Sequence, residues 1–113
     1  VWDFFINLLK MYEIYTTEEF GKDYEKLDYS IQKQVEKIFE KLKVNPYVGK
    51  PLGYDFFREK KIQNYRIYYL IYDSYVAVFV IAISDKKDQQ EVINKIKSLI
   101  PFYRGEIKKK ISE

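Results

Sequence analysis

The sequence contains neither cysteine nor histidine among its 113 residues. These absences exclude disulfide bonds, thiol nucleophiles, serine–histidine triads and zinc sites of the usual Cys/His kind. Any chemistry must therefore use Lys, Arg, Tyr, Asp or Glu, and we expect neither a metal ion nor another cofactor. The lack of cysteine also suits a reducing compartment.

Long hydrophobic runs are missing as well. The longest, YVAVFVIAI at residues 75–83 and RIYYLIY at residues 66–72, are far shorter than the roughly 20 residues of a membrane-spanning helix. The N-terminal VWDFFINLLKM has no basic leader and no small-residue cleavage site, so it does not resemble a secretory signal. The sequence therefore predicts a cytoplasmic protein without membrane contact.

Apolar residues are abundant: they make up 47% of the chain, and 12 residues are Tyr. This composition can bury a core, and the length is that of one domain. We expect that domain at residues 12–100, after an apolar extension at residues 1–11. The basic tail at residues 101–113 is expected to be a frayed, solvated end or a phosphate contact.

The net charge of +3 is unevenly distributed along the chain. Residues 1–42 hold six Lys against nine acidic residues, whereas residues 43–72 hold six Lys or Arg against two acidic residues. Five of the basic residues in the middle are Lys50, Arg58, Lys60, Lys61 and Arg66. Such asymmetry is typical of a protein that contacts a polyanion with one face.

The spacing of apolar residues predicts an α+β fold with the order β-α-α-β-β-β-α. A short strand at residues 12–16 precedes a helix capped by Thr17, and a second helix begins at Asp28 or Ser30. The segment NPYVGKPLG at residues 45–53 ends this helix. The remaining elements are strands at about 56–62, 65–73 and 75–83, and a helix at 85–100 closed by Pro101.

Three segments carry a resemblance to a known family: EKIFEKLKVNPYVGKPL, NYRIYYLIYD and VAVFVIAI. Their order and spacing within residues 12–100 resemble the RelE/ParE superfamily of type II toxin–antitoxin toxins. The resemblance implies the small RelE-like fold, a twisted antiparallel sheet with a helical hairpin packed on one face and a C-terminal helix. DKKDQQ is also similar to the segment after the last strand in HigB-like relatives, so that branch stays open.

The resemblance implies two possible functions, because the fold alone does not determine the target. RelE-like members are metal-free endoribonucleases that enter the ribosomal A site and cut mRNA. This activity, neutralised by a cognate antitoxin, is our first hypothesis, for a chain that is a monomer or weak homodimer when free. The alternative is a non-catalytic binding protein, either a ParE-like inhibitor of DNA gyrase or a degenerate toxin relative.

Metal-free RNA cleavage requires activation of a 2′-hydroxyl, stabilisation of the phosphorane and protonation of the leaving 5′-oxygen. Arg66 in YRIYY resembles the family's phosphate-binding arginine, and its guanidinium offers the donors that a phosphate accepts from. When residues are counted back from Arg66 without a gap, Glu59 matches the position of an acidic residue in the family and Lys61 matches a position that is often basic. The resemblance therefore implies that Glu59 is a possible general base and that Lys61 contacts phosphate. Strand alternation places Glu59 and Lys61 on one face and Arg58 and Lys60 on the other.

A one-residue slip would exchange these two pairs, and a solvated edge strand protected by its charges is the structural alternative. On the Arg66 face, Tyr68 is a candidate for contact with the substrate. The predicted catalytic residues are Arg66, Lys61, Glu59 and Lys60, and the predicted substrate-binding residues are Lys50, Arg58, Tyr68, Lys86 and Lys87.

The segment SDKKDQQEVI departs from the family pattern. RelE-like toxins often place an arginine after the last strand and a tyrosine in the closing helix, where this sequence has Asp88 and Ile93. Lys86 and Lys87 can supply charge, but isoleucine cannot stack on a base. Tyr65 or Tyr103 could replace the missing phenol; the departure otherwise favours the non-catalytic alternative.

Residues 1–10 precede Met11, where a family-like chain could begin. Trp2, Phe5, Ile6 and Leu9 form a helical stripe that could cover apolar surface or join a partner chain. Otherwise this segment derives from an upstream start codon or from added residues.

Overall fold

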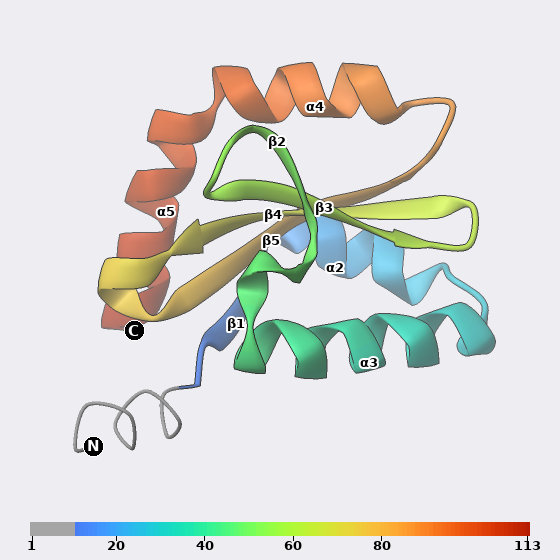
Figure 1. Cartoon of the computed structure of the whole chain (residues 1–113), viewed down its shortest axis with the longest axis horizontal. Coiled ribbons are helices and arrows are strands. Elements are labelled where there is room, and N and C mark those ends of the chain that lie inside the picture. Colours follow the sequence, from blue (N-terminus) through green and yellow to red (C-terminus); the bar gives the residue numbers. More distant parts are fainter. Residues whose placement is uncertain (1–10) are drawn as a thin grey trace.

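The computed structural model describes residues 11–113, so the apolar stripe predicted within residues 1–10 lies outside the described residues. A five-stranded sheet forms the centre of the fold, in the order β1-β5-β4-β3-β2 (Figure 1). The strands are β1 (Glu13–Thr16), β2 (Lys50–Tyr54), β3 (Phe57–Ile62), β4 (Tyr65–Tyr72) and β5 (Ala77–Asp85). β1 pairs with β5 in parallel, and the other neighbouring strands pair antiparallel. The predicted α+β fold is confirmed.

Helices cover both faces of the sheet, and in Figure 1 α3 lies below it and α4 above it. The helices are α2 (Glu18–Glu25), α3 (Tyr29–Val44), α4 (Gln89–Ser98) and α5 (Ile100–Ser112). Thr17 caps α2 as predicted, since its Oγ1 accepts a hydrogen bond from the Phe20 amide at 3.0 Å. Asp28 occupies the N-cap position of α3 but makes no capping hydrogen bond with its side chain.

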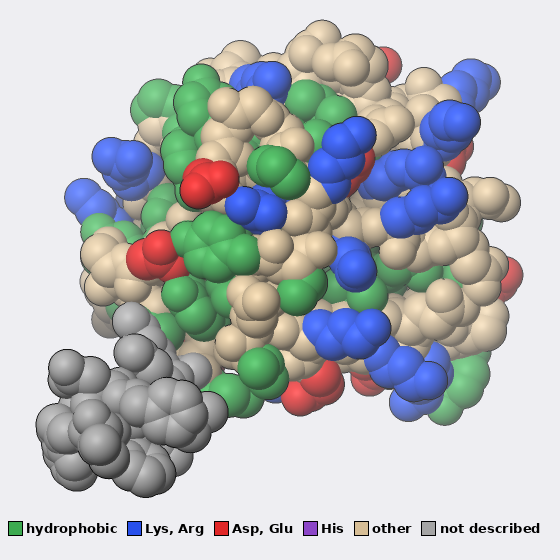
Figure 2. Space-filling model, viewed as in Figure 1, with side chains coloured by type: hydrophobic (Ala, Val, Ile, Leu, Met, Phe, Trp, Pro, Cys, Tyr) green, Lys and Arg blue, Asp and Glu red, His purple; other side chains and the backbone are tan. Residues whose placement is uncertain are grey.

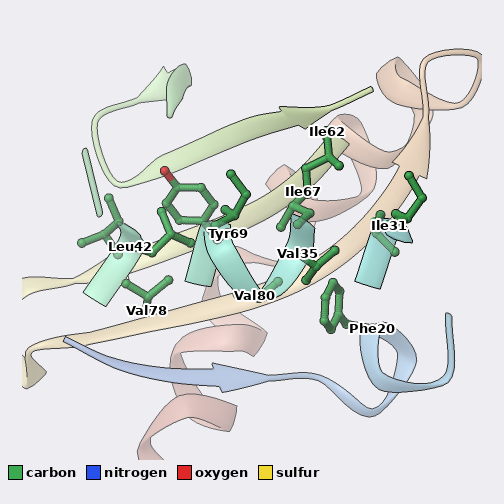
Figure 3. Packing of buried hydrophobic residues seen from close by; sticks show 12 residues of the cluster. Phe20, Ile31, Val35, Leu42, Ile62, Ile67, Tyr69, Val78 and Val80 are labelled. Atoms are coloured by element: carbon green, nitrogen blue, oxygen red, sulfur yellow. The ribbon is translucent and has the colours of Figure 1, made fainter. Parts of the chain in front are cut away.

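Two hydrophobic cores result, one on each face of the sheet. The first joins the sheet to α2 and α3, and Figure 3 shows Val35 and Leu42 of α3 facing Ile67 and Tyr69 of β4. The second joins the other face to α4 and α5; its members include Phe57, Tyr68, Leu70, Phe79, Ile93, Ile96, Tyr103 and Ile107. Because both faces are covered, β5 is apolar on both sides, as its sequence indicated.

One strand was not predicted. The segment at residues 45–53, with its two Pro and two Gly, was predicted only to end the preceding helix, but residues 50–54 form β2, which pairs antiparallel with β3. Pro51 is compatible with this assignment because β2 is an edge strand, where a missing amide hydrogen removes no bond to a further neighbour. Gly53, at φ +89°, supplies a conformation that other residues rarely adopt.

The expectation of a frayed end after Pro101 is wrong. Pro101 lies in the first turn of α5, where a backbone amide hydrogen has no intrahelical partner to lose. Tyr103 and Ile107 of this helix are buried in the second core. A proline after a helix can therefore either end the chain's helical structure or begin a further helix. Here α5 forms because it buries Tyr103 and Ile107.

Tyr69 makes the stability of the first core dependent on pH. Its buried hydroxyl donates to the Pro46 carbonyl at 2.7 Å and accepts from the Gly49 amide at 3.1 Å. Burial raises the pKa of Tyr69 from its ordinary value of 10.0 to about 12. A raised pKa means that this residue's stabilising contribution is complete below pH 10 and is lost as the pH rises towards 12.

We therefore expect the free energy of unfolding, measured with urea, to fall between about pH 10 and pH 12. The fall should be shallower in Tyr69→Phe, which cannot ionise. Other buried tyrosines contribute to the wild-type slope, so the comparison is between the two slopes. Equal slopes for the two proteins would contradict the assignment to Tyr69.

Candidate nucleic-acid interface

A shallow depression lies where β3 meets β4 and the first turn of α4. Its lining residues are Val48, Gly49, Lys50, Glu59, Lys60, Lys61, Arg66 and Gln89, and we call it the basic depression. Figure 2 shows Lys and Arg side chains gathered on the right of the view, over the end of the sheet where the β3–β4 turn lies. Four of the eight lining residues are basic and one is acidic, so the depression suits an anion.

The register of β3 and β4 brings the predicted site residues together. Lys61 lies directly opposite Arg66, and Glu59 lies directly opposite Tyr68. Directly opposed residues share one face of a sheet, so Glu59 and Lys61 lie on one face, as alternation predicted, and Arg66 and Tyr68 lie on that same face. Lys60 lies opposite Ile67, so its side chain leaves the backbone on the other face of the sheet. It nevertheless lines the same depression.

The basic groups of the depression are available for a ligand. Lys50 and Lys61 are exposed, and Arg66 is half-buried. Within residues 11–113, none of these three side chains takes part in a salt bridge. A guanidinium without a carboxylate partner keeps its donors for bidentate contact with a phosphate.

Glu59 is the acidic residue of the depression, and only 7% of its surface is exposed. Nε2 of Gln89 donates to both of its carboxylate oxygens, at 3.0 and 2.8 Å. An ionised carboxylate has about four lone-pair sites, so this contact leaves room for a further donor. Sequence reasoning missed Gln89, because its only signal was a polar residue in the first turn of a predicted helix.

Arg58 was predicted to bind substrate, and the structure corrects this assignment. Its guanidinium donates to the carbonyl oxygens of Tyr47 and Gly49 at 3.0 and 2.8 Å, and to the carbonyl and carboxylate of Asp55 at 2.8 and 3.2 Å. Its side chain is 12% exposed and lies over the Tyr47 ring. Arg58 therefore fixes the loop that precedes β2, and four of its five donors are already used.

Two tyrosines are also excluded from stacking on a base in this structure. Tyr68 lies on the Arg66 face as predicted, but it is 0% exposed and its hydroxyl shares a hydrogen bond with Oγ of Ser84 at 2.8 Å. Tyr103 is buried edge-to-face against Phe79, with ring centroids 6.0 Å apart. The assignment of Tyr68 as a substrate contact is therefore wrong, because both its ring and its hydroxyl serve the core.

A second depression adjoins the first at the end of the sheet. It is lined by Asn64, Tyr65, Asp85, Lys86 and Lys87. Tyr65 lies opposite Asp85, one position from the pair of Arg66 and Ser84, so the two depressions are neighbours. Lys86 and Lys87 are exposed, whereas half-buried Tyr65 packs against the first core, on the face of the sheet opposite Arg66.

The positions at which the sequence departs from the family pattern belong to α4. The amide of Asp88 donates to Oδ1 of Asp85 at 3.0 Å, and Asp88 precedes the first helical residue. Ile93 is buried in the second core. At these two positions the chain thus has a helix-start residue and a core residue, neither of which supplies a positive charge or an aromatic ring.

Within residues 11–113, no helix is long and apolar enough to cross a membrane. The same part of the chain holds no group of three or more acidic side chains arranged to bind a metal ion.

Comparisons with known proteins agree with this fold. Residues 14–90 match the family model described as the ParE toxin of the type II toxin–antitoxin system parDE. No curated protein matches the chain. The fold is similar to a chain of the intact RelBE toxin–antitoxin complex of E. coli, with 26% identity, a TM-score of 0.60 and coverage of 66% of this chain and 95% of that one.

Two further solved structures are similar. A chain of the RelBE2 toxin–antitoxin complex from Mycobacterium tuberculosis has 26% identity and a TM-score of 0.60, with coverage of 69% of this chain and 94% of that one. A chain of the archaeal RelE–RelB complex from Pyrococcus horikoshii has 12% identity and a TM-score of 0.60, with coverage of 67% and 96%. At 12% identity, the likeness to the Pyrococcus horikoshii chain concerns the fold alone.

Proposed function

Because the chain belongs to the ParE toxin family of type II toxin–antitoxin systems, within the RelE/ParE superfamily, we propose that it is a RelE-like, metal-free endoribonuclease that cuts mRNA in the ribosomal A site. The observation that supports this proposal best is the basic depression. It presents Arg66 and Lys61 side by side on one face of the β3–β4 ladder, with the carboxylate of Glu59 next to them. This combination offers both phosphate binding and proton transfer.

Arg66 and Lys61 would bind the scissile phosphate. Attack by the 2′-oxygen places a further negative charge on the phosphorane, and a guanidinium held in place before the reaction stabilises that charge without reorganisation. Lys50 and Lys60 line the same depression and would hold the neighbouring phosphates. Arg66 thus contributes more in the transition state than in the ground state, as catalysis requires.

Proton transfer would use Glu59 and a lysine. Glu59 accepts the proton of the 2′-hydroxyl, the 2′-oxygen forms a bond to phosphorus, and the bond from phosphorus to the 5′-oxygen breaks. The ammonium of Lys61 or Lys60 gives its proton to the leaving 5′-oxygen. Gln89 would orient the Glu59 carboxylate through its two hydrogen bonds, while the remaining lone pairs face the depression.

An antitoxin protein is the proposed partner in the cytoplasm. The similar structures from E. coli, Mycobacterium tuberculosis and Pyrococcus horikoshii are complexes of RelE with RelB. A toxin of this family would reach the ribosome and its mRNA only when the antitoxin is absent.

The second candidate is inhibition of DNA gyrase by a chain that does not cleave RNA. The matching family model is that of the ParE toxins. In addition, Ile93 and Asp88 occupy positions where RelE-like nucleases often have Tyr and Arg. Burial of Tyr68 and Tyr103 also keeps two tyrosines from stacking on a base beside Arg66.

A parallel assay with the purified protein separates the two candidates. We expect arrest of protein synthesis in a translating extract, with shortened mRNA, and unchanged supercoiling by purified DNA gyrase. Inhibited supercoiling with intact mRNA would instead establish the second candidate.

A further inference from the structure

A second group of lysines lies on α3, beside the end of β3. This end, residues 60–62, extends beyond the pairing with β2 and so forms an edge of the sheet. Lys37 and Lys41 of this helix line a depression together with Lys61, the residue that also lines the basic depression. All three side chains are exposed. Figure 2 shows basic side chains continuing from the upper right of the view to its lower right, where α3 lies in Figure 1. The two depressions are therefore joined through Lys61.

The acidic residues of α3 do not neutralise these two lysines. Glu36 pairs with Lys33 at 3.4 Å and Glu40 pairs with Lys43 at 3.1 Å, each within one turn of the helix. Within residues 11–113, Lys37 and Lys41 take part in no salt bridge. The two glutamates of α3 thus pair with Lys33 and Lys43 of the same helix. Lys37 and Lys41 therefore remain as two unpaired positive charges beside β3.

This arrangement is unfavourable for an isolated helix. Lys37 and Lys41 are four residues apart, about 6 Å along the axis, and like charges at that spacing destabilise a helix. An anion bound across the two ammonium groups would remove the repulsion. The spacing also allows the two groups to contact neighbouring phosphates of one strand.

We propose that Lys37 and Lys41 bind the phosphate backbone of an RNA segment that continues from the basic depression across the edge of β3, with Lys61 contacting RNA on both sides. This inference rests on the proposed function for the identity of the ligand. It adds Lys37 and Lys41, two residues outside the predicted site, to the residues that would contact RNA.

The chemistry of the surface favours RNA over an acidic protein. Its other polar members are half-buried Gln34 and exposed Gln63, whereas the apolar members Ile38 and Ile62 are only 8% and 3% exposed. Protein interfaces depend on buried aromatic or aliphatic anchors, while contacts to a phosphate backbone need only cationic and amide groups. An acidic peptide would find charge here but no apolar anchor site.

The test uses the full chain and a fluorescent 2′-O-methyl single-stranded RNA, which binds but cannot be cut, titrated at several salt concentrations. The slope of log affinity against log salt reports about 0.7 per neutralised phosphate for single strands. We expect the slope of Lys37→Ala/Lys41→Ala to be shallower than that of wild type by about 1.4. Alanine is a better helix former than lysine, so the variant should fold normally.

Lys22→Ala/Lys26→Ala is the matched control, because these two lysines are also exposed and four residues apart but lie at the end of α2 among Glu18, Asp23 and Glu25. It should keep the wild-type slope. An unchanged slope for Lys37→Ala/Lys41→Ala, or an equal loss in both double variants, would overturn the proposal. So would loss of binding to polyglutamate with no change towards RNA, which would assign the surface to an acidic protein.

The outcomes also separate this inference from the proposed function. If Arg66→Ala abolishes mRNA cleavage while Lys37→Ala/Lys41→Ala keeps the wild-type salt slope, only the further inference fails. If wild type binds RNA with the predicted contribution of the two lysines but cuts no mRNA, the contact stands and the nuclease proposal fails.

Discussion

Replacing Arg66 by alanine is expected to lower the rate of ribosome-dependent mRNA cleavage by about 10²–10³-fold, the usual loss when one preorganised donor to a developing anion is removed. Arg66 is half-buried, lies opposite Lys61 and lines the basic depression. Its removal leaves the phosphorane with lysines alone. Because a lysine cannot make the bidentate contact, Arg66→Lys should recover only part of the activity.

The fold should survive the Arg66 substitution, since this side chain takes part in no salt bridge within residues 11–113. We expect the free energy of unfolding to stay within about 0.5 kcal/mol of wild type. Arg104→Ala is the control: Arg104 is exposed on α5, at the far end of the sheet, and its removal changes the net charge equally (Figure 1). Wild-type cleavage by Arg66→Ala, or an equal loss in both variants, would refute the role of Arg66.

Replacing Arg58 by alanine is expected to destabilise the protein by about 2–4 kcal/mol, because hydrogen bonds from a charged donor are lost and the part-buried carbonyl oxygens of Tyr47 and Gly49 lose their donor. The guanidinium donates to the carbonyl oxygens of Tyr47, Gly49 and Asp55. Its stem and its contact with the Tyr47 ring are lost as well. Urea unfolding measures the change as a lower midpoint at constant m.

Lys60→Ala is the matched comparison, because Lys60 lies two positions further along β3 and takes part in no salt bridge within residues 11–113. We expect its midpoint to stay close to that of wild type. An Arg58→Ala protein as stable as wild type but weaker in RNA binding would contradict the structural role and restore the prediction that Arg58 contacts substrate.

The sequence predicted the part of the site that depends on local periodicity. Alternation along a strand has a period of two, and the two residues between Ile62 and Tyr65 leave little freedom in the pairing of β3 with β4. Lys61 and Arg66 therefore had to share a face once the strands were located. The cap at Thr17 and the helical hairpin followed from equally local signals.

The rest of the site depends on contacts between residues far apart in the sequence. Glu59 and Gln89 are 30 residues apart, and no local pattern indicates that the first turn of α4 lies over β3. The role of Arg58 depends on the carbonyl oxygens of a loop that precedes β2. The sequence shows charge in each case, but only the packed structure shows which charges are already used.

The same limit applies to the aromatic residues. Tyr68 and Tyr65 are both phenols close to Arg66 in the sequence, and alternation alone placed Tyr68 on the better face. The pair α4 and α5 covers that face, so Tyr68 is buried and Tyr65 remains half-exposed at the end of the sheet. The sequence did not show which face of the sheet α4 and α5 cover, so burial of Tyr68 could not be predicted either.

Primer extension on mRNA from a translating extract tests the central claim most directly, with wild-type protein beside Arg66→Ala and Arg104→Ala. The account predicts cuts inside codons that require ribosomes, appear with wild type and Arg104→Ala, and vanish with Arg66→Ala. Intact mRNA at every concentration of the wild-type protein would contradict it and leave a binding protein with this fold.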